Sequence, residues 1–143
     1  PNGGSSLYDK ITSTELRTLT IAARTDWLCD QLDRPNFECA ADGANVRINT
    51  SFTTQFGYSP AEMLGQRWVR SVHQDDRERV MAEWMHAIGD QRMFESTYRA
   101  VTRAGVVMRV RVIAEPQPHP MTGAILRWLG RIEIMKSETG VAV

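Results

Sequence analysis

A histidine and two aspartates stand close together in the segment VHQDDRERV, where they could do acid–base chemistry. Histidine is the commonest general base, and a carboxylate beside it could orient its ring. Such a site also needs a nucleophile and an oxyanion donor, and neither signature accompanies His73, Asp75 and Asp76. We therefore interpret His73 as a residue of helix entry and capping. An enzyme with a small-molecule substrate, using His73 and Asp76, is the weakest of our hypotheses.

The other reactive residue types are scattered along the chain. Cys29 and Cys39 lack the Cys-x-x-Cys spacing of a redox pair and have no nearby His or Cys at metal-ligand spacing, so we expect two unreactive thiols. The glycines of FGYSPAEMLG lack the lysine that follows the second glycine in a phosphate-binding loop. The sequence therefore predicts no catalytic residue and no metal site.

Size and charge are those of one ordinary domain. A chain of 143 residues can bury a single core without disulfides, and its 17 basic and 17 acidic residues are interspersed, unlike the basic footprint of a nucleic-acid binder. No apolar run approaches the roughly 20 residues that span a bilayer, and no signal segment opens the chain. We expect a soluble, cytoplasmic domain with no membrane segment and no nucleic-acid partner.

The chain begins with a linker-like PNGGSS rather than a methionine, which indicates a piece of a larger protein. We divide it into a linker at 1–12, a flanking helix at 13–35, the main domain at 36–136 and a C-terminal linker at 137–143. Helical spacing over about 13–32 places Leu16, Leu19, Ala23 and Trp27 on one apolar stripe. This stripe predicts a homodimer formed through the N-terminal helix.

Short helices are predicted after a first hairpin around Asp42-Gly43. Asn49, Thr50 or Ser51 can cap a two-turn helix that ends at Gly57, and Ser59 with Glu62 has the spacing of a capping box. A longer helix is predicted from an N-cap at Asp75 to a closing Gly89. Its apolar side carries Val80 and Trp84.

Alternating residues after position 92 predict three strands, FESTYRAVTR, VVMRVRVIAE and AILRWLGRIEIM. The intervening PQPHPMTG is predicted to be a loop, because three prolines remove ladder donors. Strands on one side of a set of helices describe an α+β domain with an antiparallel sheet, buried on one face.

The segments FGYSPAEMLGQRW, VHQDDRERV, FESTYRAVTRAG and GAILRWLGRIEI, in this order, resemble the PAS domain family of sensory modules. The resemblance covers about 37–136. It implies a five-stranded antiparallel sheet of order 2-1-5-4-3, with short helices over one face that often enclose a small-molecule cavity.

The resemblance also bears on cofactors. Light-sensing flavin members have a reactive cysteine at the position of Trp68, and haem-binding members have their iron-binding histidine at the position that aligns with Val80. Flavin adduct chemistry and haem are therefore disfavoured, and the ligand stays unknown.

An aromatic-rich set of residues could line a cavity or simply fill a core, and the sequence leaves both open. Gly130 leaves room for a neighbouring side chain or for a ligand. The candidate lining residues are Phe52, Phe56, Trp68, Val80, Trp84, Val110, Trp128 and Gly130.

By resemblance, we expect a non-catalytic sensory domain that binds a small ligand or a partner and signals to a covalently attached output domain. The leading hypothesis is the input module of a bacterial sensor histidine kinase, so that the full-length protein would be the kinase. The alternative is a ligand-free dimerisation scaffold of a cyclase or a transcription regulator.

Overall fold

The structure is a computed structural model, and it describes residues 33–135. The predicted helix at 13–32, with its apolar stripe, lies outside the described residues. No helix within 33–135 is long and apolar enough to cross a membrane. The elements in order are β1 (Asn36–Ala40), β2 (Asn45–Ile48), α3 (Thr50–Phe56), the 3-10 helices η2 (Ala61–Met63), η3 (Arg67–Ser71) and η4 (Gln74–Asp76), α4 (Arg77–Asp90), β3 (Phe94–Val101), β4 (Val107–Pro118) and β5 (Ile125–Ile134).

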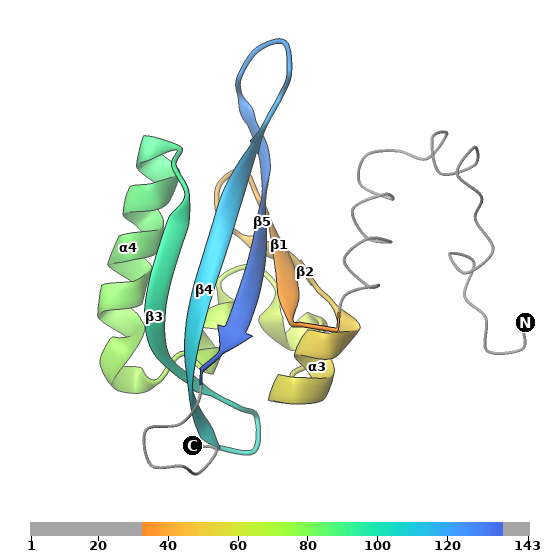
Figure 1. Cartoon of the computed structure of the whole chain (residues 1–143), viewed down its shortest axis with the longest axis vertical. Coiled ribbons are helices and arrows are strands. Elements are labelled where there is room, and N and C mark those ends of the chain that lie inside the picture. The colour runs from red at the N-terminus through yellow and green to blue at the C-terminus, as the bar shows by residue number, and fades with distance from the viewer. Residues whose placement is uncertain (1–32, 136–143) are drawn as a thin grey trace, which may run out of the picture.

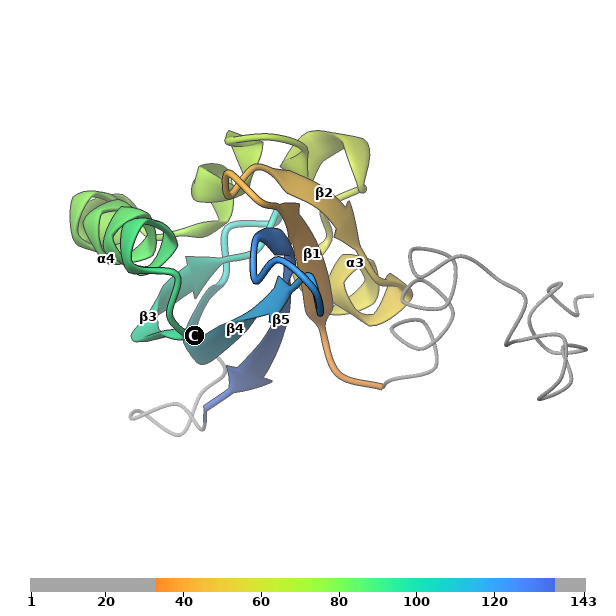
Figure 2. The same cartoon turned by 90° about the horizontal axis from the view of Figure 1, so that it is seen from above.

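The five strands form one antiparallel sheet of order β2-β1-β5-β4-β3, which confirms the predicted α+β architecture. Within residues 33–135 the first and last strands, β1 and β5, are neighbours in the middle of the sheet, so β5 joins the β1–β2 hairpin to the β3–β4 hairpin (Figure 1). The helices gather over one face of the sheet, which we call the inner face (Figure 2). Side chains alternate along β3 between this face and solvent.

Asn49 fixes the start of the helical layer. Its Oδ1 accepts hydrogen bonds from the backbone N–H groups of Asn36 and Phe52, both at 3.0 Å, and its Nδ2 donates to the Arg34 carbonyl at 3.1 Å. The side chain therefore caps α3 and ties that helix to β1 at the same time. Gly57 ends α3 with a left-handed φ of 84°, as predicted.

The predicted capping box is present. The Ser59 N–H donates to Glu62 Oε1 at 2.9 Å, and the Glu62 N–H donates to Ser59 Oγ at 3.3 Å. Arg103 Nε, from the turn after β3, donates to Glu62 Oε2 at 2.8 Å. The Ser59 backbone hydrogen bond and then Arg103 lower the pKa of Glu62 to about 2. The carboxylate thus links the η2 turn to the sheet.

The longer helix begins and ends later than predicted. The chain enters it through η4, where the Asp75 N–H donates to His73 Nδ1 at 3.1 Å, so His73 is a capping residue and Asp75 is not the N-cap. At the other end Gly89 stays helical, and Gln91 adopts the left-handed conformation with φ of 52°. A glycine such as Gly89 can adopt the left-handed conformation but need not do so. The later helix end is stabilised by hydrogen bonds from the Gln91 and Arg92 N–H groups to the last helical carbonyls.

The outer edge of β3 is covered by His73, by Asp76 at the end of η4 and by Arg79 in the first turn of α4. The His73 N–H donates to the Arg99 carbonyl at 2.8 Å, and the Arg99 N–H donates to Asp76 Oδ2 at 2.9 Å. Arg79 donates to the Thr97 carbonyl at 3.0 Å. The Arg99 guanidinium binds the same Asp76 carboxylate at 2.8 and 3.0 Å, and these bonds hold the pKa of Asp76 well below its usual range.

The predicted loop PQPHPMTG is partly strand, which corrects the sequence interpretation. Pro116 pairs with Trp128 and Pro118 with Ile125, within β4. Beyond Ala114 β4 has β5 as its one neighbour, because β3 begins at Phe94, opposite Ala114. The missing proline N–H groups fall on this unpaired side, where no ladder bond is lost. The β4–β5 hairpin therefore extends beyond the body of the domain (Figure 1).

Candidate functional site

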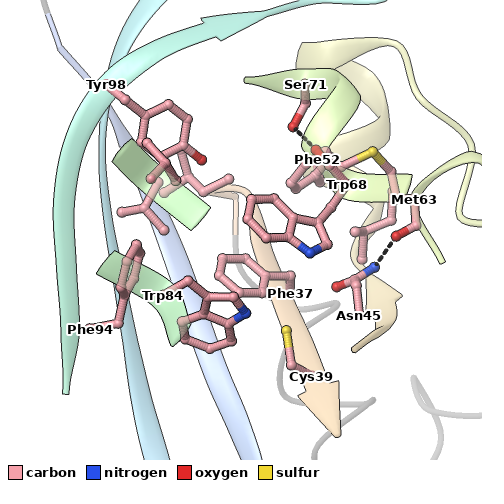
Figure 3. A pocket seen from close by; sticks show the side chains of 14 residues that line it. Phe37, Cys39, Asn45, Phe52, Met63, Trp68, Ser71, Trp84, Phe94 and Tyr98 are labelled. Atoms are coloured by element: carbon pink, nitrogen blue, oxygen red, sulfur yellow. Dashed lines mark hydrogen bonds between the residues drawn. The ribbon is translucent and has the colours of Figure 1, made fainter. Parts of the chain in front are cut away.

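A cavity of about 50 Å³ lies between the inner face of the sheet and the helices (Figure 3). One water needs about 10–15 Å³ of such space, so the cavity exceeds a single-water void several-fold. Strand side chains form its floor: Phe37, Cys39, Ile48, Phe94, Tyr98, Val112 and Ile132. Helical side chains form its roof, among them Phe52, Met63, Trp68, Val80 and Trp84.

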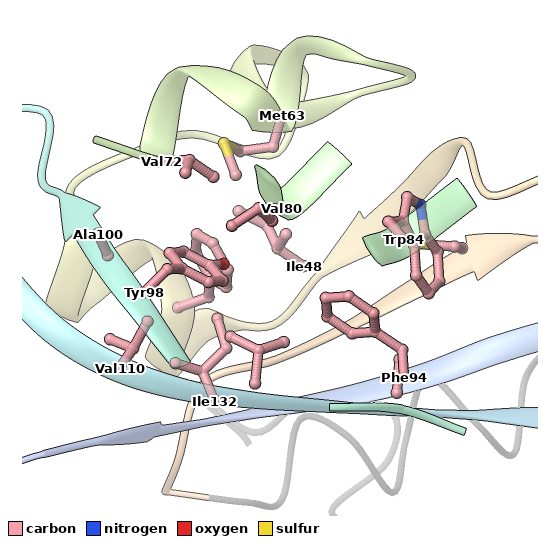
Figure 4. Close-up of a cluster of buried hydrophobic side chains, with 14 of the residues drawn as sticks. Ile48, Met63, Val72, Val80, Trp84, Phe94, Tyr98, Ala100, Val110 and Ile132 are labelled. Atoms are coloured by element: carbon pink, nitrogen blue, oxygen red, sulfur yellow. The ribbon is translucent and has the colours of Figure 1, made fainter. Parts of the chain in front are cut away.

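Sequence spacing explains why the two layers meet here. Val80 and Trp84 are one turn apart on α4 and both are buried, at 1% and 4% exposed. The Trp84 ring packs edge-on against Phe94 and Trp128, with centroids 5.1 Å apart in each pair. The surrounding cluster of buried apolar side chains holds these walls in place (Figure 4).

The polar groups of the lining are few. Asn45 Nδ2 donates to the Met63 carbonyl at 3.0 Å, and Ser71 Oγ donates to the Trp68 carbonyl at 2.7 Å. Burial raises the pKa of the Cys39 thiol to about 12 and raises the pKa of Tyr98 above its usual value. None of the lining residues carries a charge at neutral pH, so the cavity is an apolar environment that favours uncharged groups.

Trp68 stands apart among these groups. Its ring is partly buried on η3, but its indole Nε1 is buried and has no hydrogen-bond acceptor among residues 33–135. In Figure 3 the nitrogen edge of the ring turns toward Phe37 and Asn45. A buried donor without a partner is rare in folded proteins.

Four of the eight candidate lining residues, Phe52, Trp68, Val80 and Trp84, do line the cavity. The structure places the other four, Phe56, Val110, Trp128 and Gly130, outside the lining. Phe56 is buried against Phe52 at the end of α3, and Val110 and Trp128 are fully buried in the packed core.

Gly130 is covered by a neighbouring side chain. A Cβ built on Gly130 would lie 2.1 Å from Cζ of Phe37, its partner residue on β1. The Phe37 ring therefore occupies the space over the glycine. The room that Gly130 leaves is filled by a neighbouring side chain and not by a ligand. The same placement makes Phe37 part of the cavity wall.

Sequence reasoning missed ten of the fourteen lining residues: Phe37, Cys39, Asn45, Ile48, Met63, Ser71, Phe94, Tyr98, Val112 and Ile132. Tyr98 had a usable signal, because it alternates with Phe94 on the inner face of β3. Phe37 and Met63 had none, since their positions depend on the register between β1 and β5 and on the path of η2.

Arg111, Arg127 and Arg131 of the sheet are paired with carboxylates. Arg111 binds Glu95 and Glu133 at 2.7 and 3.1 Å, and Arg127 lies 3.5 Å from Glu38. These pairs give Arg111 and Arg127 carboxylate partners within the protein. No group of three His, Cys, Asp or Glu residues within the described part of the chain could hold a metal ion.

The five-stranded antiparallel sheet, with short helices over one face and a cavity between the two layers, defines a small α+β domain. A sequence model of the family described as PAS fold matches residues 45–132, and the chain belongs to this family. An uncharacterised protein, y4lL of Sinorhizobium fredii, is 31% identical over 77 residues, which are 54% of this chain and 9% of that protein. The chain thus spans a small part of that relative.

Solved PAS domains share the fold at low sequence identity. A PAS domain of a protein from Colwellia psychrerythraea has a TM-score of 0.64 at 19% identity, over 81% of this chain and 98% of that one. A LOV protein of Rhodobacter sphaeroides scores 0.66 at 16% identity, over 79% and 66%. The N-terminal domain of a diguanylate cyclase with a PAS/PAC sensor, from Marinobacter aquaeolei, scores 0.63 at 17% identity, over 70% and 93%.

Proposed function

We propose that this PAS domain is a non-catalytic sensory module that binds a small molecule in its central cavity and signals to an attached output domain. The cavity carries this proposal. Protein interiors are close-packed and contain few voids larger than a water molecule, whereas this core keeps about 50 Å³ open beside fully buried side chains such as Val110 and Trp128.

Two lining residues supply an entry path. Phe37 and Trp68 are partly buried, unlike the fully covered Val80, so a ligand can enter by displacing these two rings. A bound molecule would press on Phe37, which packs over Gly130 of β5. Because β5 also contributes Ile132 to the lining, binding would act directly on the central strand.

A thermal-shift screen of small neutral molecules tests the binding. A ligand that binds the folded state must raise its stability by mass action, by about 2.7 kcal/mol at a concentration one hundred times Kd. Val80→Leu adds a methylene group to the cavity wall and should weaken this stabilisation. Ala82→Leu, at an exposed position of the same helix, is the matched control and should keep it. Equal stabilisation of both variants would place binding elsewhere.

For the output we propose a bacterial sensor histidine kinase, with a cyclase or a transcription regulator as the alternative. The long Sinorhizobium relative and the cyclase-linked Marinobacter domain support a sensor attached to further domains. The full-length gene product should incorporate phosphate from ATP at a histidine. Nucleotide cyclisation or DNA binding instead would select the alternative.

A ligand-free interaction scaffold is the second candidate, and the Phe37 ring over Gly130 favours it, because that ring already fills part of the space. Under this reading no small molecule stabilises the domain, and dimerisation carries the function. Sedimentation of the chain with and without residues 1–32 tests the proposed dimer through Leu16, Leu19, Ala23 and Trp27. A monomer in both cases would remove the dimer.

A further inference from the structure

The indole N–H of Trp68 is the one indole donor within residues 33–135 that the fold leaves unused. Trp84 Nε1 donates to the Gly43 carbonyl at 3.3 Å, and Trp128 Nε1 donates to the Ala41 carbonyl at 3.2 Å. Trp68 Nε1 is equally buried and donates to no atom of the described chain. An unmade bond of this kind destabilises a protein, so a partner that arrives from outside gains by supplying the acceptor.

The surroundings of Trp68 restrict what that partner can be. The donors beside it are in use, since Asn45 Nδ2 bonds to Met63 and Ser71 Oγ bonds to Trp68's own carbonyl. The rest of the wall is apolar, with Phe52, Trp84 and Ile132 among its members. A charged ligand would lose its hydration here without gaining a counter-ion.

We infer that the cavity selects a small uncharged molecule that bears a hydrogen-bond acceptor, such as a carbonyl or ether oxygen, and that this oxygen accepts from Trp68 Nε1–H. The inference rests on the proposed function, because it specifies the ligand of the same cavity. The acceptor would lie against the nitrogen edge of Trp68, and the apolar body of the ligand would fill the space between the sheet and α4 (Figure 3).

A pair of probes separates this inference from binding as such. Cyclopentanone and cyclopentane have the same ring and differ by the carbonyl oxygen. Both are titrated into the full chain labelled with ¹⁵N, and the Trp68 indole N–H resonance, assigned from the spectrum of Trp68→Phe, is followed. We expect about tenfold tighter binding of cyclopentanone, the value of one additional hydrogen bond, with a downfield shift of that resonance for the ketone only.

Two variants complete the test. Trp68→Phe keeps a ring in the wall but removes the donor, so the tenfold preference should vanish. Trp128→Phe removes an indole N–H outside the lining, which already donates to Ala41, and should keep the preference. If Trp68→Phe fails to fold, the Trp68 indole resonance of the wild-type chain is assigned instead from through-bond and NOE spectra, and its response to the two probes remains decisive.

Equal binding of the two probes, with an unmoved Trp68 resonance, would overturn the inference and leave the proposed binding function standing. The absence of binding by either probe would overturn both. A Trp68 N–H that is already bonded in the free protein, for example to Asn45 Oδ1, would show as a resonance that the ketone does not shift, and this too overturns the inference.

Discussion

Replacing Gly130 by alanine tests how tightly the Phe37 ring fills the sheet face. The new Cβ would lie 2.1 Å from Cζ and 2.4 and 2.5 Å from the two Cε atoms of the ring. Carbon atoms in contact lie about 3.5–4.0 Å apart, so the ring must move by about 1.5 Å. Overpacking of this kind costs about 1–3 kcal/mol of folding free energy.

A second effect has the opposite sign. Alanine has fewer unfolded conformations than glycine, which stabilises a protein by about 0.4–1 kcal/mol where the native backbone suits it. Gly130 is not among the glycines with positive φ, so its backbone does suit alanine. We therefore expect Gly130→Ala to destabilise the wild type by about 1–2 kcal/mol. In a Phe37→Ala background the same change should stabilise the domain by about 0.5 kcal/mol.

Urea denaturation of the wild type, the two single variants and the double variant measures the effect of Gly130→Ala on the unfolding free energy in each background. The difference between these two effects gives a coupling free energy of about 2 kcal/mol between Phe37 and Gly130. The most specific expectation is that Gly130→Ala lowers the unfolding free energy of the wild type but raises that of the Phe37→Ala variant. If Gly130→Ala destabilised both backgrounds by the same amount, the Phe37 ring would not be what fills the space, and our account of the cavity wall would be wrong.

Three further perturbations address other parts of the structure. Asp76→Asn weakens the bonds to Arg99 and should cost about 2 kcal/mol in urea denaturation at pH 7. Because folding lowers the Asp76 pKa, its stabilisation is present above about pH 4 and is lost in acid, so the wild type and the variant should differ less at pH 3, and an equal gap at both pH values would contradict this. Asn49→Ala removes three hydrogen bonds of a side chain whose residue is 1% exposed and should lower the unfolding free energy by about 3 kcal/mol, whereas a loss below about 1 kcal/mol would show that the bonds are dispensable. In a Cys29→Ser chain, Cys39 should react with iodoacetamide about a hundredfold more slowly when folded than in urea, because the raised pKa and burial suppress the thiolate, and rapid labelling of the folded protein would refute its burial.

Local signals predicted much of the fold. The Ser59–Glu62 spacing, the left-handed Gly57 and the alternation along β3 act over a few residues, and each appears as expected. The errors arose where contacts between segments far apart in the sequence determine the local structure. Pro116 is tolerated in β4 because β3 has already ended on that side. The predicted N-cap Asp75 instead lies within η4, which His73 caps while the His73 N–H bonds to the Arg99 carbonyl of β3.

The candidate site was harder to predict for the same reason. Aromatic residues at helical spacing identify Trp84 as buried, but nothing local separates a cavity wall from filled core. Whether Trp128 or Phe37 faces the open space depends on the pairing of β1 with β5, in which Phe37 lies opposite Gly130 and Cys39 opposite Trp128. That register joins segments about ninety residues apart, and periodicity does not encode it.

The bonds along the outer edge of β3 also limit how this domain can assemble. An edge strand with open N–H and C=O groups is a template on which another strand can grow, and such growth leads to aggregation. Here the Arg99 N–H and carbonyl and the Thr97 carbonyl are already engaged by Asp76, His73 and Arg79. A second copy that tried to continue the sheet on this side would have to break these bonds first. The aspartate that fastens η4 to the sheet thereby also guards the domain against polymerisation through β3.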